Sequence, residues 1–518
     1  MPRHTRPTYT VLLPVLLLAF LLLSGCRKEP QPAQATPDLP EAGSGVYVSI
    51  TVTADGGFGP SSSRTGVPGT RVPNPGEDGD GEQPGTGDEN MVHDINVFFL
   101  TGSFPDGGSI LDDNDARIVA SEYFSGDDIR PSASGDITLY TVQREIEGLS
   151  VGGQYHALAI VNAGENLGER NPDPVETVTD LQDLTFSEVI NTVTEEDGTS
   201  HRKFLMASAD DSGLIEIEPN NSPYNPTVVR IPVERMAARV DCRFEFGDRL
   251  FPVDNTNDKV QIIGAAIANK YKQTYAFKRV TANGYDPNSI EYLGKEQPID
   301  GSGVALNYVV DPKLLAAQSN PDDEYASDYT ATSWDAPEIM WQLPSDEITS
   351  DFNGVTYGLL DYTTENVVSK EVVSSSRKEY CTGVVFKAQY LIDGNATPGE
   401  GETTYNVYWY EGNIYSSMGA IEDQLEVGTI DESEYGKYGI RKYPGGICYY
   451  TYWIRHADDG DSDAVSPMEY ATVRNNIYQL NVNSISGIGG VTPGDEGEII
   501  IKVTLAPWRQ EINVYPEF

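Results

Sequence analysis

The chain has 518 residues, with 79 Asp or Glu against 35 Lys or Arg, so its formal charge at neutral pH is -44. Nucleic acid and anionic membrane surfaces are poor partners for this negative field, because binding to phosphates requires basic patches. The length predicts two or three domains.

The N-terminal residues predict export. A short basic segment precedes an apolar run of thirteen residues, Val11–Leu23. This run is too short to span a bilayer, which takes about 20 residues, and it is typical of a cleaved signal peptide covering residues 1–25. The tetrapeptide Leu-Ser-Gly-Cys that ends at Cys26 resembles a bacterial lipobox, which implies acylation of the Cys26 thiol. An ordinary signal peptide with an incidental cysteine is the alternative.

The first predicted strand covers residues 46–54, after a Pro-, Ala- and Gly-rich tether over residues 27–45. Successive side chains in a strand point to opposite faces, so one face here is apolar and suited to a core. It carries Val46, Val48, Ile50 and Val52. A long polar stretch over residues 55–90 follows and contains Arg64 and Arg71.

Strand patterns dominate the rest of the chain, as short alternating runs of Val, Ile, Thr, Tyr and Phe between turn-forming clusters. They lie at residues 95–100, 137–146, 155–162, 228–246, 382–392, 405–410, 447–454, 477–485 and 499–508. Helical periodicity is confined to residues 181–191 and 312–318. The long polar stretches at 163–200, 281–335 and 393–404 are expected to be surface excursions. The pattern predicts a mainly β protein with two antiparallel β-sandwich domains, long loop insertions and few short helices.

The domain boundary is predicted from a proline. Pro232 interrupts the run at 228–246, and proline is confined to an edge or a break in a sheet. We therefore place the boundary near residue 230, which gives an N-terminal sandwich over residues 65–229 and a C-terminal sandwich with insertions over residues 230–496.

The cysteines that remain after Cys26 are Cys242, Cys381 and Cys448. Their number is odd, they have no CxxC spacing, and they lie in apolar alternating stretches. Buried free thiols are therefore favoured over one disulfide with an orphan cysteine.

Motifs for catalysis or metal binding are not evident in the sequence. It contains no HExxH pattern, and His156 lies inside a predicted strand, where we expect a structural role. The acidic run at residues 458–463 lacks the glycine and terminal glutamate of an EF-hand, so a solvated loop is favoured over a calcium site. We expect no enzymatic activity, no cofactor and no bound metal.

Three stretches carry a family resemblance: VRIPVERMAARVDCRF in the middle of the chain, VRNNIYQLNVNSISGIG at 473–489, and IIIKVTLAPW after a Gly- and Asp-rich spacer. Together with the lipobox, they resemble the fimbrillins of Bacteroidetes type V pili, and within that group most closely the Mfa-type minor fimbrial stalk subunits. The resemblance implies two transthyretin-like β-sandwich domains, in agreement with the strand pattern.

The resemblance also implies a route of assembly. Such subunits reach the outer membrane as lipoproteins, an Arg-specific protease cuts after the first strand, and strands from the C-terminus of a neighbouring subunit replace it. Residues 26–64 would then be a lipidated propeptide with a removable strand, cut between Arg64 and Thr65. Arg71 is the alternative site, but a proline two residues after it restricts the backbone, and proteases prefer flexible tips with small residues.

The donor strand would be the C-terminal segment, residues 497–518, behind a hinge at residues 489–497. Its first run presents Ile499, Ile501, Val503 and Leu505 on one face, and its second run presents Trp508, Ile512 and Val514. A final hairpin that completes its own domain is the alternative.

The resemblance thus implies a structural shaft subunit of a cell-surface fimbria, which supports adhesion and biofilm formation. The implied partners are other copies of the chain, other fimbrial subunits, an Arg-specific protease, membrane lipid before cleavage, and surface receptors of a host or of bacteria. The alternatives are a terminal fimbrial subunit, as tip adhesin or anchor, and a surface glycan-binding lipoprotein. The 30 Tyr and 5 Trp suggest the last one.

Overall fold

The computed structural model describes the chain from residue 45 to residue 507, with gaps. The described residues are 45–53, 85–102, 109–134, 137–194, 198, 200–281, 290–292, 308–312, 341–368, 378–456, 465, 468–494 and 499–507. The predictions for Cys26, Arg64, Thr65, Arg71, residues 313–318, the acidic run at 458–463, and Trp508, Ile512 and Val514 lie outside them.

Nine strands of the N-terminal part form one sheet in the order β3-β2-β6-β10-β12-β1-β5-β4, with β11 paired to β6. Their bounds are β1 (Val46–Thr53), β2 (Asp94–Thr101), β3 (Arg117–Ser125), β4 (Arg130–Ser134), β5 (Ile137–Ile146), β6 (Gln154–Val161), β10 (Met206–Ser208), β11 (Ile215–Glu216) and β12 (Thr227–Arg235). The sheet curls, so that strands near opposite ends of this order approach each other: Arg144 of β5 forms an ion pair with Glu122 of β3 at 3.4 Å. Its inner face encloses a continuous apolar core.

Two sheets form the C-terminal part and share a second core that includes Val240, Phe386 and Leu480. The five-stranded sheet has the order β20-β21-β13-β27-β28, and the four-stranded sheet the order β14-β15-β22-β26. Their bounds are β13 (Ala237–Phe244), β20 (Thr349–Phe352), β21 (Val355–Thr364), β27 (Asn476–Ile485), β28 (Ile499–Pro507), β14 (Leu250–Pro252), β15 (Lys259–Ala268), β22 (Gly383–Leu391) and β26 (Ile447–Trp453).

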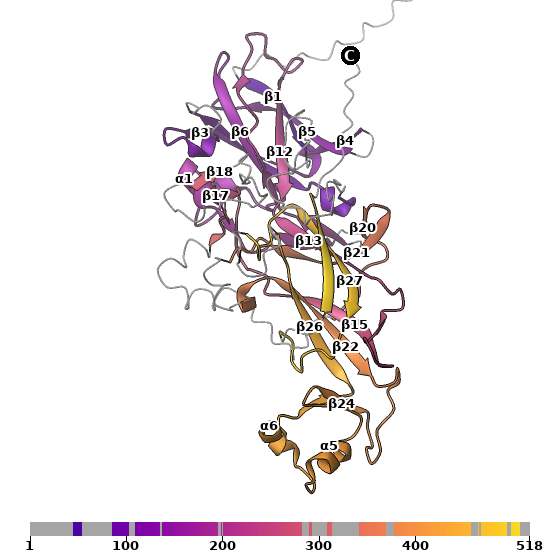
Figure 1. Cartoon of the computed structure of the whole chain (residues 1–518). Helices are drawn as coiled ribbons and strands as arrows, with labels where there is room; N and C mark the ends of the chain where they lie inside the picture. Colours follow the sequence, from indigo (N-terminus) through magenta and orange to yellow (C-terminus); the bar gives the residue numbers. More distant parts are fainter. Residues whose placement is uncertain are drawn as a thin grey trace, which may run out of the picture. The chain divides into compact units, whose positions relative to one another are not determined.

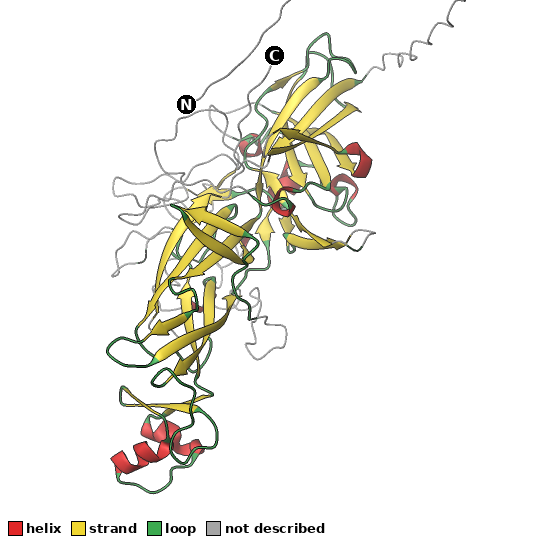
Figure 2. Ribbon diagram, turned by 90° about the vertical axis from the view of Figure 1, so that its right-hand side faces the viewer, coloured by secondary structure: helices red, strands yellow, loops and turns green. Residues whose placement is uncertain are grey.

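The remaining elements are short (Figure 2). The strands are β7 (Thr185–Phe186), β8 (Ile190–Thr194), β9 (Ser200–Phe204), β16 (Thr274–Tyr275), β17 (Arg279–Thr281), β18 (Ile290–Tyr292), β19 (Tyr308–Val309), β23 (Asn406–Tyr410), β24 (Asn413–Tyr415) and β25 (Arg441–Pro444). The helices are α1 (Val178–Asp183), α5 (Met418–Leu425) and α6 (Tyr435–Tyr438), with 3-10 turns η1 (Asp88–Asn90), η2 (Ile110–Asp112), η3 (Gly126–Asp128), η4 (Leu167–Glu169), η5 (Lys378–Tyr380) and η6 (Glu432–Glu434). No helix among the described residues is long and apolar enough to cross a membrane.

The mainly β prediction is confirmed, and a strand occupies every predicted strand run. The prediction of purely antiparallel sheets is wrong at two places, since β1 with β12 and β13 with β27 are parallel pairs. The helix predicted at 181–191 is also wrong: α1 ends at Asp183, and β7 pairs with β16 instead.

The passage between the two parts of the fold lies at Met236. β12 ends at Arg235 in the N-terminal sheet, and β13 begins at Ala237 in the five-stranded sheet. The boundary predicted near residue 230 therefore falls inside β12. Pro232 is tolerated there because it is the last residue of β12 opposite β1, and the bonds to β10 begin at the next residue.

Candidate functional site

The first strand, β1, lies inside the N-terminal sheet rather than at its edge. It pairs in parallel with β12 and antiparallel with β5, and Figure 1 shows the three strands next to one another. The alternation predicted from the sequence is observed, because Val46, Val48, Ile50 and Val52 are 0 to 2% exposed while the intervening residues are half-buried. The apolar face of β1 is thus a full part of the core.

The centre of β1 is enclosed on both sides. Ile50 lies opposite Val142 of β5 and Val229 of β12, and all three side chains are buried. Without β1, both β12 and β5 would become strand edges with unpaired backbone groups, and an apolar slot would open between them. Unpaired strand edges favour pairing with another strand.

The outer face of β1 is polar. The Tyr47 hydroxyl donates to Glu145 of β5 at 3.1 Å, and the hydroxyls of Thr51 and Thr141 lie 3.4 Å apart. Burial, together with the hydrogen bond to the Glu145 carboxylate and its charge, raises the pKa of Tyr47. The Tyr47 hydroxyl therefore keeps its proton at physiological pH and acts as a hydrogen-bond donor to Glu145.

The last described strand, β28, lies at one edge of the five-stranded sheet and pairs antiparallel with β27. Ile499, Ile501 and Val503 pack against the C-terminal core, while Ile500 on the other face is 54% exposed. In this arrangement β28 completes the sheet of its own chain, which is the alternative that the sequence left open.

The hinge predicted at residues 489–497 is anchored at its start. Gly490 exchanges two backbone hydrogen bonds with Tyr449 of β26, at 2.7 and 3.0 Å, and the Tyr443 hydroxyl donates to the Gly489 carbonyl at 3.1 Å. A Cβ atom on Gly489 would lie 2.3 Å from the Tyr449 oxygen, so only glycine fits there. Any movement of β28 must therefore begin after Gly490.

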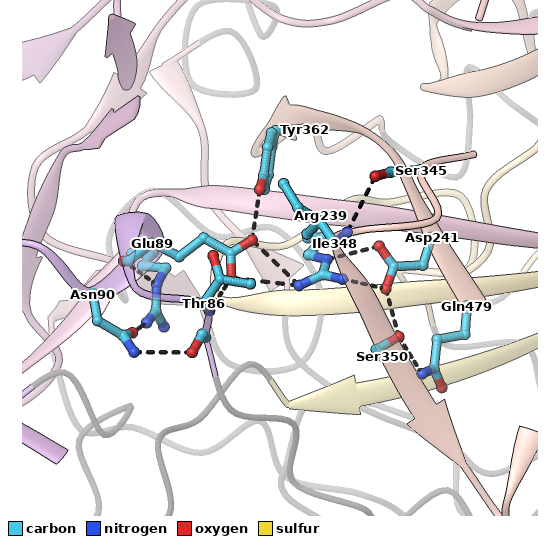
Figure 3. A network of polar contacts seen from close by, with 12 residues as sticks. Thr86, Glu89, Asn90, Arg239, Asp241, Ser345, Ile348, Ser350, Tyr362 and Gln479 are labelled. Atoms are coloured by element: carbon cyan, nitrogen blue, oxygen red, sulfur yellow. Dashed lines mark hydrogen bonds and ion pairs between the residues drawn. The ribbon is translucent and has the colours of Figure 1, made fainter. Parts of the chain in front are cut away.

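A buried polar network joins η1 to the C-terminal sheet (Figure 3). The Glu89 carboxylate accepts from Arg239 at 3.2 Å and from the Tyr362 hydroxyl. Arg239 also donates to both oxygens of Asp241, at 2.7 and 2.8 Å, and Asp241 accepts from Ser350. Buried charges are stable only when they are paired in this way.

A second arginine fixes the same segment. Arg235 donates to the Glu89 backbone oxygen at 2.9 Å and to the Asn90 side chain. Burial lowers the pKa of Arg235 to about 10, although Glu89 opposes the change. Burial also raises the pKa of Asp241, which the bonds from Arg239 and Ser350 partly offset. The segment at 85–90 is thus fastened to the body immediately after the undescribed stretch that contains Arg64.

Sequence reasoning missed this network. Its visible signal was the pair Arg239 and Asp241, two residues apart on one face of an apolar strand. The partner Glu89 lies 150 positions earlier in the chain, and no local pattern connects it to Arg239.

Other singled-out residues have structural contacts. Arg474, from the motif used for the family resemblance, is buried and forms an ion pair with Glu365 at 3.0 Å. His156 lies 3.2 Å from Asp211 in the core. The three described cysteines, Cys242, Cys381 and Cys448, are buried free thiols, as predicted. Among the described residues, no group of three or more His, Cys, Asp or Glu could hold a metal ion.

Comparison with known proteins identifies the C-terminal part. Residues 441–513, which include β25 to β28, match the model of the family of the major fimbrial subunit protein type IV, fimbrillin, C-terminal. No curated protein sequence matches the chain.

Several solved structures are similar. A fimbrilin from Porphyromonas gingivalis W83 is 14% identical, with 90% of this chain and 98% of that chain covered and a TM-score of 0.36. The tip fimbrial protein Mfa3 from Porphyromonas gingivalis, with a C-terminal truncation, is 12% identical, with 89% and 99% covered and a TM-score of 0.33. A fimbrial assembly protein from Parabacteroides distasonis ATCC 8503 is 8% identical, with 89% and 96% covered and a TM-score of 0.32.

Residues 441–513 are thus similar to the C-terminal part of fimbrillins, which are major fimbrial subunit proteins. This match agrees with the resemblance to fimbrillins that the sequence motifs indicate.

Proposed function

We propose that this chain is a shaft subunit that is exported as a lipoprotein, activated by removal of β1, and polymerised by strand exchange. The observation that carries the proposal is the position of β1. It is the first described strand of the chain, yet it lies between two other strands of a sheet. Its loss would open a slot with a hydrogen-bonding edge on either side, at β12 and at β5.

The cut is proposed between Arg64 and Thr65, with Arg71 as the alternative. Both arginines lie between Thr53, where β1 ends, and Gly85, where the described chain resumes. A cut at either arginine would separate β1 and the lipid on Cys26 from the body of the protein. The two events, release from the membrane and opening of the slot, would then result from one reaction.

The donor is proposed to be the C-terminal segment of a second copy. Its strand β28 is an edge strand with an apolar face, and edge strands detach more readily than central strands because only one neighbour holds them. Each Ile or Leu side chain buried in the slot would contribute about 1.5 to 3 kcal/mol. Several such anchors would make the exchange very slow to reverse.

The cut is tested with Arg64→Ala and with Arg64→Ala combined with Arg71→Ala, and boiled and unboiled samples are compared on gels. Arg64→Lys is the matched control for charge, since an Arg-specific protease would not cut it either. We expect the double variant to keep its full length and to lose the ladder of high-mass species. Full conversion of the double variant to the shorter form would refute the proposed activation.

The donor is tested by deleting residues 498–518. A truncated chain that still forms the shaft would refute the donor role. A truncated chain that is found only at fibre ends is the expected result, because it can accept a donor strand but cannot supply one.

A further inference from the structure

A side-chain amide takes the place of a backbone partner where β1 begins. The Tyr47 N–H donates to Asn221 Oδ1 at 2.8 Å, and Asn221 Nδ2 donates to the Tyr47 carbonyl oxygen at 2.8 Å. The N–H and C=O of one residue in an extended strand point to the same side. Asn221 therefore gives Tyr47 the two hydrogen bonds that a neighbouring strand would give.

The side chain bonds to β1 at the point where its neighbouring strand begins. The parallel ladder between β1 and β12 begins with Val48 opposite Thr227, the first residue of β12, so no residue of β12 lies opposite Tyr47. Asn221 extends the bonded part of β1 by one residue.

Contacts outside β1 hold this amide. Asn221 Nδ2 also donates to Thr227 Oγ1 at 3.0 Å, and the Asn221 N–H donates to the Glu218 carbonyl at 3.0 Å. Gln143 of β5 fastens the same turn by donating to the Pro223 carbonyl at 2.6 Å. Because β1 supplies none of these bonds, the amide would remain in place after β1 is removed.

We propose that Asn221 sets the register of the strand that replaces β1, by binding the backbone of the C-terminal segment of a second copy. This inference rests on the proposed strand exchange. The amide binds only the backbone N–H and C=O of the strand in this position, so it can bind two strands of different sequence. It requires a residue with an N–H at its position and thus excludes proline there.

The register follows from the apolar pattern. The buried positions Val46, Val48, Ile50 and Val52 are matched by Ile499, Ile501, Val503 and Leu505 when the two strands run in the same direction. Ile500 then takes the place of Tyr47 at Asn221, and Pro507 falls one residue beyond the position of Thr53.

Other registers fit worse. A shift of one residue turns the apolar face out of the core. A shift of two residues one way places Pro507 at the position of Val52, inside the slot. A shift of two residues the other way leaves only Gly497 to fill the position of Val46.

The register is tested by disulfide formation in fibres of the full chain. Glu145 lies opposite Tyr47, so it would face Ile500 of the second copy. This is a pair without mutual hydrogen bonds, whose side chains lie close enough for a disulfide. We expect Glu145→Cys with Ile500→Cys to form cross-linked chains in non-reducing gels. The control, Glu145→Cys with Lys502→Cys, moves the second cysteine by two residues on the same face and should cross-link far less. Equal or stronger cross-linking in the control would overturn the proposed register.

The role of the amide is tested with Asn221→Asp, which keeps the size of the side chain but removes the donor. Asn225→Asp makes the same change in the same turn, where the side chain donates to Asn220 and not to β1. Losing one bond and opposing a carbonyl with a carboxylate should slow assembly about tenfold or more, whereas the control should assemble normally.

The outcomes separate the two proposals. If the unchanged chain does not assemble after cleavage, or assembles without residues 498–518, the strand exchange itself is wrong. If it assembles and both aspartate variants assemble at the same rate, only the role of Asn221 is wrong. If the Asn221→Asp chain does not accumulate, the cross-linking pairs decide the register, because they keep Asn221.

Discussion

Replacing Ile50 by alanine should weaken the uncut chain and leave the assembled fibre unchanged. Ile50 is fully buried at the centre of β1, between Val142 and Val229. Truncation of a buried isoleucine to alanine costs about 2 to 5 kcal/mol, from lost transfer free energy and from the cavity left behind. Both neighbours belong to paired strands and cannot easily collapse into the gap, so we expect a value in the upper half of this range.

The measurement compares free energies of unfolding of the uncut chain in urea, with Thr51→Ala as the matched control. Thr51 is the next residue of β1, half-buried on the polar face, and its loss should cost less than about 1 kcal/mol. The same two variants are then cut and assembled, and the temperature at which the fibres dissociate is measured. Since β1 has left the fibre, neither variant should change this temperature.

Two results would count against the reasoning. A fibre that loses as much stability as the uncut Ile50→Ala chain would mean that β1 remains in the assembled subunit. An uncut Ile50→Ala chain that unfolds like the unchanged protein would mean that β1 does not belong to the core.

Three further predictions concern the anchoring of the two ends. Glu89→Gln removes one buried charge from beside Arg239, and should lower the free energy of unfolding by about 3 kcal/mol in denaturant titrations. Gly489→Ala forces a Cβ onto the Tyr449 oxygen and should cost about 1 to 3 kcal/mol, seen as a lower melting temperature; an unchanged melting temperature would show that the segment is not anchored. The pKa of Tyr47 is raised, so the folded chain holds this proton more tightly than the unfolded chain. The stability that the Tyr47 hydroxyl adds is therefore complete below pH 10 and is lost as the pH rises through the folded-state pKa. The difference in stability between the unchanged chain and Tyr47→Phe should shrink above pH 10, and a constant difference would contradict this.

The strands could be predicted from the sequence because their signal is local. In β1, the period of two among Val46, Val48, Ile50 and Val52 is sufficient to define both the strand and its buried face. The prediction of a helix at 181–191 was wrong because the deciding interaction is not local. Its few apolar residues fit a helical period, but pairing of β7 with β16 decides the conformation of Thr185 and Phe186.

The neighbours of β1 could not be predicted, because they depend on distant pairings. β12 lies about 180 positions after β1, and its parallel pairing with β1 leaves no local mark in either strand. Asn221 shows the same limit. Asparagine in a turn before Pro226 is an ordinary turn signal, and only the register between β1 and β12 places its amide on the backbone of Tyr47.

A strand that can be removed without unfolding the protein must meet two opposing requirements. It must lie at an end of the chain, so that one cut frees it, and it must lie inside a sheet, so that its loss leaves a slot with two edges. β1 meets both requirements. A further requirement is that the residues after the cut do not unfold when β1 leaves, and the buried polar network around η1 meets it. Glu89, held by Arg239 and Tyr362, and Asn90, held by Arg235, fasten the chain just after the proposed cut. Because these bonds are buried and charge-assisted, departure of β1 would stop at this point and leave the C-terminal sheet intact.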